Sequence, residues 1–189
     1  EDALRAMAEG ARGADMLITT GGASVGDHDL VRKVLGAEGL DLTFYKVAMR
    51  PGKPLIFGRL KGIPVLGLPG NPVSAGVTSV IFLKAAIDEM LGIGNADVGP
   101  RTALLGRDLE ENDHRQDYLR AKLSHDEDGH LVVTPFEKQD SAMMAWLAEA
   151  DCLVVRPPNA KAAKKGEPAE IIPLGVSLGA PGDGGSGLF

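Results

Sequence analysis

Residues 15–35 read DMLITTGGASVGDHDLVRKVL, and this stretch decides the fold class. Residues 15–19 form a short apolar run, which predicts a buried strand. A glycine-rich loop follows at residues 19–29, and residues 30–35 then place apolar side chains on one face of a helix. A strand that runs through a tight loop into a helix is the repeating unit of an α/β fold.

The same alternation continues along the chain to about residue 92. Residues 40–49 are rich in β-branched and aromatic residues, which predicts a second strand. Residues 54–59 and 63–68 flank a Lys61-Gly62 turn and predict a hairpin. A long helix is expected over residues 72–91. Its apolar face is expected to include Val73, Val77, Val80, Ile81, Ile87 and Leu91.

A second domain is expected after the glycines and prolines of residues 92–100. Short strand-like pieces follow, and one helical segment at residues 142–150 interrupts them. The strand-like pieces are residues 102–105, 117–123, 130–135, 152–156 and 169–173. This pattern predicts an α/β domain over residues 1–95 and a small β-rich domain over residues 96–175. The glycine-rich residues 176–189 are expected to be a flexible tail.

The composition excludes several classes of protein. The formal net charge is −6 and aromatic residues make up only 4%, so a nucleic-acid partner is not expected. The single cysteine, Cys152, excludes an intrachain disulfide and a multi-cysteine metal site. With no signal peptide and no apolar run near about 18 residues, we expect a soluble, cytoplasmic chain without a membrane partner.

The glycine-rich loop is the first candidate for ligand binding. Its glycines let the backbone approach an anion closely and expose N–H groups to it. Asp27 is expected to cap the following helix, with Asp29 in the first turn. The spacing alone leaves open a simple strand-to-helix turn with capping aspartates. It fits neither a P-loop nor the glycine spacing of a dinucleotide-binding fold.

A second tight bend reads LPGNPVS at residues 68–74. Asn71 before Pro72 predicts a capping residue followed by the first helical position. Ser74 is then expected in the first turn, where it could donate a hydrogen bond to an oxyanion beside the free N–H groups. The alternative is a well-capped helix with no ligand.

The third candidate is a basic segment, KVAMRPGKP, at residues 46–54. Arg50 and Lys53 each precede a proline, which restricts their backbone to extended conformations. Cations that are already held in position engage an anion at a lower entropic cost. We therefore expect the two bends and the basic segment to converge on one ligand that carries phosphate or a similar oxyanion.

These three motifs, in this order and at these intervals, resemble the MoeA/gephyrin family of molybdopterin molybdenumtransferases over about residues 1–92. Residues 98–175 resemble the family's C-terminal β domain more weakly, through DYLRAKL at 117–123 and KQDSAMMAWLAEADCLVV at 138–155. The resemblance implies a three-layer, MogA-like molybdopterin-binding α/β domain, truncated at its N-terminus, followed by a small all-β, barrel-like domain. It implies that adenylylated molybdopterin is hydrolysed and molybdate is inserted at its dithiolene, with release of AMP.

The resemblance also assigns roles to individual residues. The implied catalytic residues are Asp29, Lys46, Arg50 and Lys53, with Asp29 also holding Mg²⁺. The implied substrate-binding residues are Gly21, Gly22, Ser24, Pro69, Gly70, Asn71, Pro72 and Ser74, with Arg120 and Ser141 as ligands of molybdate. Arg50 stands where the family often has lysine, and this exchange keeps the positive charge. An exposed strand arginine and a helix-capping serine remain the alternatives for Arg120 and Ser141.

The family's chain is roughly twice as long as this one, which opens inside a helical pattern without an initiator methionine. The sequence is therefore expected to be a fragment, and it does not decide whether this portion is active alone. The resemblance implies a homodimer for the complete protein and a molybdopterin adenylyltransferase as a possible partner. Two alternative functions stay open, namely molybdopterin adenylyltransferase activity and a non-catalytic pterin-binding scaffold of the gephyrin type.

Overall fold

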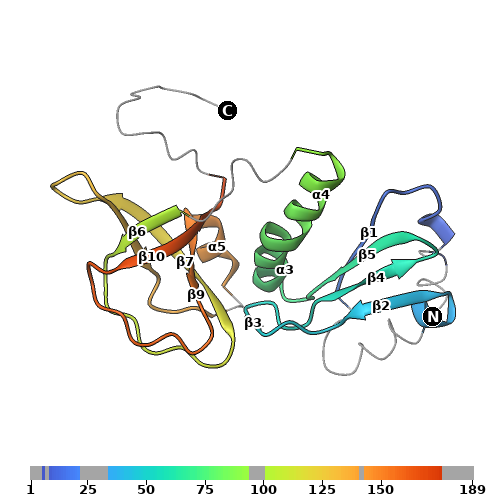
Figure 1. Ribbon diagram of the computed structural model, residues 1–189, viewed down its shortest axis with the longest axis horizontal. Helices are drawn as coiled ribbons and strands as arrows, with labels where there is room; N and C mark the ends of the chain where they lie inside the picture. Colours follow the sequence, from blue (N-terminus) through green and yellow to red (C-terminus); the bar gives the residue numbers. More distant parts are fainter. Residues whose placement is uncertain (1–5, 7–8, 22–33, 94–100, 141–142, 176–189) are drawn as a thin grey trace.

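The structure is a computed structural model that describes residues 6, 9–21, 34–93, 101–140 and 143–175. Figure 1 shows one sheet on one side, a β-rich domain on the other, and a long helical segment between them. The expected tail at residues 176–189 and most of the helix expected at residues 30–35 lie outside the described residues. Among the described residues, we find no helix with the length and apolarity needed to cross a membrane.

The sheet of the α/β domain has the strand order β1-β5-β4-β2. These strands are β1 (Leu17–Thr20), β2 (Leu40–Phe44), β4 (Ile56–Leu60) and β5 (Ile63–Leu68). Strands β1 and β5 pair in parallel, and β4 pairs antiparallel with both β5 and β2. The predicted hairpin is confirmed, and Lys61 and Gly62 both have positive φ, at 50° and 89°. Two such residues form the turn whose twist matches a two-residue hairpin.

Both faces of this sheet are covered. Two neighbouring residues of β5 show this, since each packs in a different hydrophobic cluster. Val65 packs with Leu35 and Leu60 on one face. Leu66 packs with Leu55 on the other face, against Phe82 and Leu83 of the long helical segment. Since successive side chains of a strand point to opposite faces, the sheet is the middle of three layers.

The long helix predicted over residues 72–91 exists, but its character changes in the middle. It consists of α3 (Pro72–Thr78), the π-helical turn η1 (Ser79–Leu83) and α4 (Lys84–Met90). Val73 and Val77 are fully buried, as predicted. The expectation was wrong for Ile87 and Leu91, which are 42% and 66% exposed. A π-helical turn shifts the phase of the residues after it, and α4 extends beyond the sheet in Figure 1.

The β-rich domain is a closed five-stranded barrel. Its strands are β6 (Arg101–Leu105), β7 (Gln116–His125), β8 (Leu131–Pro135), β9 (Cys152–Arg156) and β10 (Pro168–Pro173). Their order is β7-β8-β6-β10-β9, and an additional β7–β9 pairing closes the circle. Helix α5 (Met144–Glu149) precedes β9, within the predicted helical segment. Cys152 lies in the barrel core, where burial and the neighbouring charge of Asp151 raise the pKa of its thiol to about 12.

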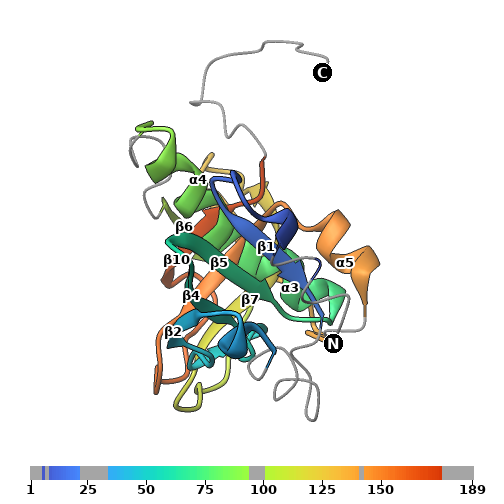
Figure 2. The ribbon, with the colours of Figure 1, turned by 90° about the vertical axis from the view of Figure 1, so that its right-hand side faces the viewer.

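A two-residue strand, β3 (Met49–Arg50), joins the two domains by pairing in parallel with the start of β7. Next to this pair, the Gln116 backbone N–H donates to the Ala48 carbonyl at 2.9 Å. Met49 is 2% exposed and packs with residues of α3, β7 and β9, among them Val77 and Leu153. Figures 1 and 2 together place α3 between the sheet and the barrel. The domains therefore share a small core at their junction.

Candidate functional site

The bend before α3 has the cap that its sequence predicted. The Asn71 side-chain oxygen accepts a hydrogen bond from the Ser74 backbone N–H at 3.1 Å, and Pro72 is the first helical residue. Ser74 is only 7% exposed. Because its N–H is used by the cap, Ser74 can offer a ligand its hydroxyl group but not this N–H.

The two tight bends lie against each other. The Gly21 N–H donates to the Leu68 carbonyl at 3.3 Å. A Cβ atom at Gly70 would lie 3.2 Å from the Gly21 Cα, so a larger residue at position 70 would crowd the neighbouring bend. Pro69 lies between Leu68 and Gly70 in the same bend. Four predicted site residues, Gly22, Ser24, Asp29 and Ser141, lie outside the described residues.

The basic segment packs against α3 through Gly52. This glycine has a φ of 115°, and a Cβ atom there would lie 2.5 Å from the Thr78 Cγ2. The Arg50–Pro51 peptide bond next to it is cis. The Val47 amide donates to the Lys53 carbonyl at 3.0 Å, which closes the segment into a compact loop. Figure 1 shows this loop, between β2 and β4, at the border with the barrel.

Lys46 and Lys53 share a cavity of about 270 Å³ with two residues from the barrel. The barrel residues are His114 and Arg115, which precede β7, and Val47 and Ala48 complete the lining. None of the described residues that line this basic cavity is acidic. Its four polar side chains come from two segments that are far apart in the sequence, and an anion is the ligand that they suit.

Arg50 does not line the basic cavity. Its guanidinium pairs with the Asp117 carboxylate, with Asp113 at 3.5 Å and with the Asn112 side-chain oxygen at 3.4 Å. Asp117 is 4% exposed, and one of its oxygens, Oδ1, has no hydrogen-bond partner among the described residues. The structure therefore places Arg50 in an ion pair between the domains, outside the lining of the basic cavity.

A second cavity, of about 200 Å³, lies at the junction and shares no lining residue with the basic cavity. Arg50 and Asp117 contribute to it, together with further arginines and glutamates. These further charged residues are Arg107, Glu110, Glu111, Glu137 and Arg156. We call it the paired cavity, because both arginines and carboxylates line it. Neither the basic nor the paired cavity is lined by a described residue of the two tight bends.

Arg120 is buried, with 1% of its surface exposed, so the alternative of an exposed strand arginine is wrong. Its Nε donates to the Gln139 side-chain oxygen and its Nη1 to the Met143 carbonyl, both at 3.3 Å. Burial lowers the pKa of its guanidinium, while Asp140 acts in the opposite direction. These bonds hold Arg120 against the segment that contains the predicted partner, Ser141.

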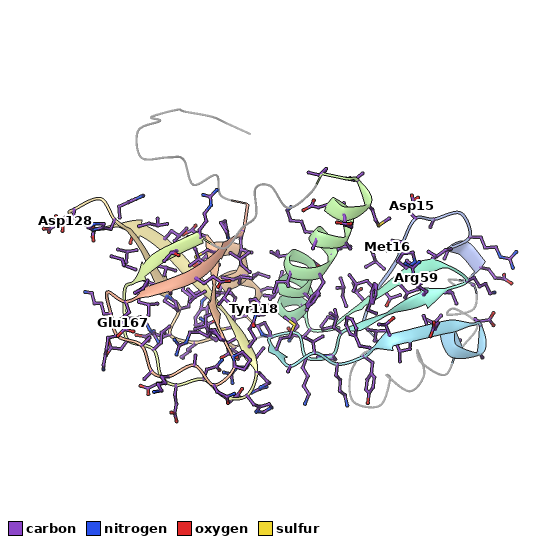
Figure 3. All side chains as sticks on the ribbon, viewed as in Figure 1. Asp15, Met16, Arg59, Tyr118, Asp128 and Glu167 are labelled. Carbon is purple, nitrogen blue, oxygen red and sulfur yellow. The ribbon has the colours of Figure 1, made fainter. Side chains whose placement is uncertain are left out.

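Three exposed side chains, Asp126, Asp128 and His130, gather at the turn between β7 and β8. Asp128, labelled in Figure 3, marks this turn at the far end of the barrel from Tyr118 at the junction. The Asp126 carboxylate accepts from the His130 N–H at 2.8 Å and lies 3.1 Å from its ring Nδ1. These bonds within the turn account for the grouping, and we assign no metal ion to it.

Sequence reasoning missed His114 and Arg115, which were not among the predicted site residues. Arg115 stands two residues before the predicted strand at residues 117–123, and nothing in the sequence around it indicates contact with the basic segment. The pairing of β3 with β7 brings these two residues to the basic segment. A strand of only two residues leaves no pattern in the sequence from which this pairing could be predicted.

Both domains of this chain match known protein families. Residues 1–89 match the family described as a probable molybdopterin binding domain, and residues 102–174 match the MoeA C-terminal region, domain IV. A molybdopterin molybdenumtransferase of Haemophilus influenzae is 33% identical over 167 residues, which cover 88% of this chain and 41% of the relative. The enzyme of the same name from Bacillus subtilis is 30% identical over 172 residues, covering 91% and 40%.

A similar fold is found in a crystal structure of the molybdopterin biosynthesis MoeA protein from Pyrococcus horikoshii. It matches with a TM-score of 0.73 and 26% identity, over 92% of this chain and 40% of that one. The chain therefore spans about 40% of the length of the relatives it matches. The expected fold class, an α/β molybdopterin-binding domain followed by a small β barrel, is confirmed.

Proposed function

The chain belongs to the MoeA family of molybdopterin molybdenumtransferases, and from this premise we propose that the protein completes molybdenum cofactor synthesis in the cytoplasm. In this proposal, adenylylated molybdopterin is hydrolysed at its phosphoanhydride bond, AMP leaves, and molybdate is inserted at the dithiolene sulfurs. The substrate and the released nucleotide are both anionic, so the site needs fixed positive charge.

The basic cavity at the domain junction is the observation that carries this proposal. It collects Lys46 and Lys53 with His114 and Arg115 around one space, and the described residues of its lining include no carboxylate. A chain with a net charge of −6 offers such a concentration of cations only locally. Positive groups that are fixed before binding stabilise the charge that develops when a phosphoanhydride is cleaved.

Within this proposal the predicted residues have different tasks. Lys46 and Lys53 hold phosphate oxygens, and Arg50 positions the basic segment against the barrel through Asp117. Arg120 and Ser141, with the hydroxyl of Ser74, remain our candidates for molybdate. Gly21, Gly22, Ser24 and Asn71 shape the two bends that receive the pterin end of the substrate.

The proposal assigns Mg²⁺ to Asp29, where the ion would neutralise phosphate charge when bound. Asp29 lies outside the described residues, and the two aspartates beside the basic segment do not fit this ion. Asp113 uses both carboxylate oxygens on Arg115, and Asp117 pairs with Arg50. Of these two aspartates, Asp117 keeps one oxygen, Oδ1, without a hydrogen-bond partner among the described residues, and one oxygen is too few for a cation that prefers several oxygen ligands. We therefore derive no step through the ion.

Neither alternative function is favoured by the domain content. A molybdopterin adenylyltransferase is expected to end after the α/β domain, whereas this chain continues into a barrel that matches the MoeA C-terminal region. We also propose a homodimer that receives its substrate from a molybdopterin adenylyltransferase. We propose no nucleic-acid or membrane partner.

The test is AMP release by the protein at its natural full length, supplied with adenylylated molybdopterin and molybdate. Lys53→Ala and Asp29→Asn should each lower the rate about 100-fold, as removal of one fixed electrostatic partner commonly does. Lys122→Ala, which removes an exposed lysine that contacts Asp151 on the barrel, is the matched control and should change the rate little. No AMP release by the unsubstituted protein would refute the transferase function and favour a binding role.

A further inference from the structure

We propose that His114 and Arg115 complete the basic cavity as a binding site for a diphosphate group, so that the barrel supplies half of the phosphate contacts. The identity of the natural ligand, the phosphoanhydride of a nucleotide-linked substrate, rests on the proposed function. The site itself rests on the geometry of two loops and on their charges.

The loop that carries these two residues is held rigidly. The Asn112 amide Nδ2 donates to the carbonyls of Arg115, Arg156 and Pro157 at 2.8, 3.1 and 2.9 Å. The Asn159 N–H donates to the Asp113 carbonyl at 2.7 Å. Because the backbone of this loop is already fixed, it does not have to be ordered when a ligand binds, which lowers the entropic cost of binding.

The same loop is tied to the basic segment, which brings the two halves of the cavity together. Met49 pairs with Gln116 and Arg50 with Asp117 in the short parallel ladder. The ion pair between Arg50 and Asp117 lies at the end of this ladder. His114 and Arg115 directly precede it in the sequence, and Lys46 and Lys53 flank the other strand, so all four side chains meet at one end of the junction.

The charges around the cavity match a diphosphate group. Asp113 accepts from the Nε and Nη2 atoms of Arg115, and these hydrogen bonds hold the pKa of Asp113 well below its usual range. Two lysines and Arg115 carry three positive charges and Asp113 carries one negative charge, which leaves two positive charges beside His114. A diphosphate linkage carries one negative charge on each phosphate group.

The size of the cavity also suits this ligand. Its volume of about 270 Å³ lies just below the range of roughly 300–1,000 Å³ that is typical of pockets for drug-sized molecules. The space accommodates the diphosphate part of a substrate and leaves the rest of the molecule outside. Arg115 keeps its Nη1 atom without a hydrogen-bond partner among the described residues, and this atom can donate to a phosphate oxygen.

The test is calorimetric titration of the purified chain with inorganic pyrophosphate at constant ionic strength. Arg115→Gln should weaken binding about 10-fold, because it removes one charged donor. His114→Ala, which breaks no hydrogen bond described in the protein, should weaken binding about 3-fold. Arg115→Lys keeps the charge and should retain most of the affinity, and Lys122→Ala should leave it unchanged.

The unfolding transition of each variant shows whether its fold is intact. No binding of pyrophosphate, or equal binding by the unsubstituted chain and by His114→Ala and Arg115→Gln, would overturn the inference. AMP release separates this result from the proposed function. Pyrophosphate binding that depends on Arg115, without AMP release, would leave the site standing and refute the transferase. AMP release with no dependence of pyrophosphate binding on either residue would refute only the site.

Discussion

The two cavities at the domain junction differ in whether carboxylates balance their positive charges. Lys46 and Lys53 face the basic cavity, whose described lining holds no carboxylate. In the paired cavity, Arg50 lies with other arginines and with carboxylates, and its own partner Asp117 is buried. All three cations come from one nine-residue segment.

This difference shows how one motif can serve binding and structure together. A cation that is paired with a buried carboxylate is already neutralised, so it contributes mainly to holding the segment in place. A cation without such a partner keeps its charge available for an anionic ligand. We therefore propose that the two lysines bind the ligand and that Arg50 holds the segment that carries them in place.

The largest effect on stability is expected at Met49, because the packing of the whole domain junction depends on this residue. It is 2% exposed and packs in the core that α3 shares with β7 and β9. Met49→Ala should lower the free energy of unfolding by about 3 kcal/mol, since it leaves a cavity in a packed core. Chemical denaturation measures this, and Met144→Ala, at a methionine that is 48% exposed, is the control that should change stability by less than about 0.5 kcal/mol.

A smaller effect on stability is expected from a substitution that changes only the paired cavity. Asp117→Asn removes the charge that Arg50 faces in a largely buried position, and we expect a loss of about 2 kcal/mol in stability. The value is modest because the Arg50 side chain is 48% exposed. Pyrophosphate affinity should stay within about twofold if the two cavities are separable. A tenfold loss of affinity at unchanged stability would contradict the division of roles.

A substitution that changes only the basic cavity should lower ligand affinity and leave stability nearly unchanged. Lys53→Gln is expected to weaken pyrophosphate binding about 10-fold, which corresponds to about 1.4 kcal/mol, and to leave the unfolding midpoint nearly unchanged. The affinity is measured by calorimetry and the stability by denaturation of the same samples. Lys122→Gln is the control for the loss of a surface charge. A Lys53→Gln chain that binds normally would remove this residue from the site.

The smallest effect is expected at the start of α3, away from both cavities. Asn71→Ala should cost about 1 kcal/mol of stability, because the Ser74 N–H loses its cap. Asn71→Asp keeps an acceptor at this position and should recover most of the loss. Pyrophosphate affinity should not respond to either change. A clear response would show that this bend belongs to the same anion site as the lysines.

Much of the fold could be read from local patterns. The Lys61-Gly62 turn between two apolar runs predicted the hairpin, and Asn71 with Pro72 predicted the start of α3. These signals lie within a few residues of the structure that they determine. The exposure of Ile87 could not be read in this way, because nothing in the sequence marked the π-helical turn before it.

The site was harder to predict, because its contacts span long stretches of sequence. Arg50 reads as an available cation until its partner, 67 residues further on, is known. Arg115 reads as a surface residue until β3 is seen to pair with β7. The burial of Arg120 follows from its bonds to Gln139 and Met143, which approach it only through the folding of the barrel. Each of these contacts depends on tertiary structure that has no local pattern.

The most direct test of the account is a crystal structure of the chain with bound pyrophosphate. We predict the ligand in the basic cavity, with phosphate oxygens within hydrogen-bond distance of Lys46, Lys53 and Arg115, and with Arg50 still paired to Asp117. Pyrophosphate at the Asn71 bend instead, or in the paired cavity with Arg50 turned toward it, would contradict the account.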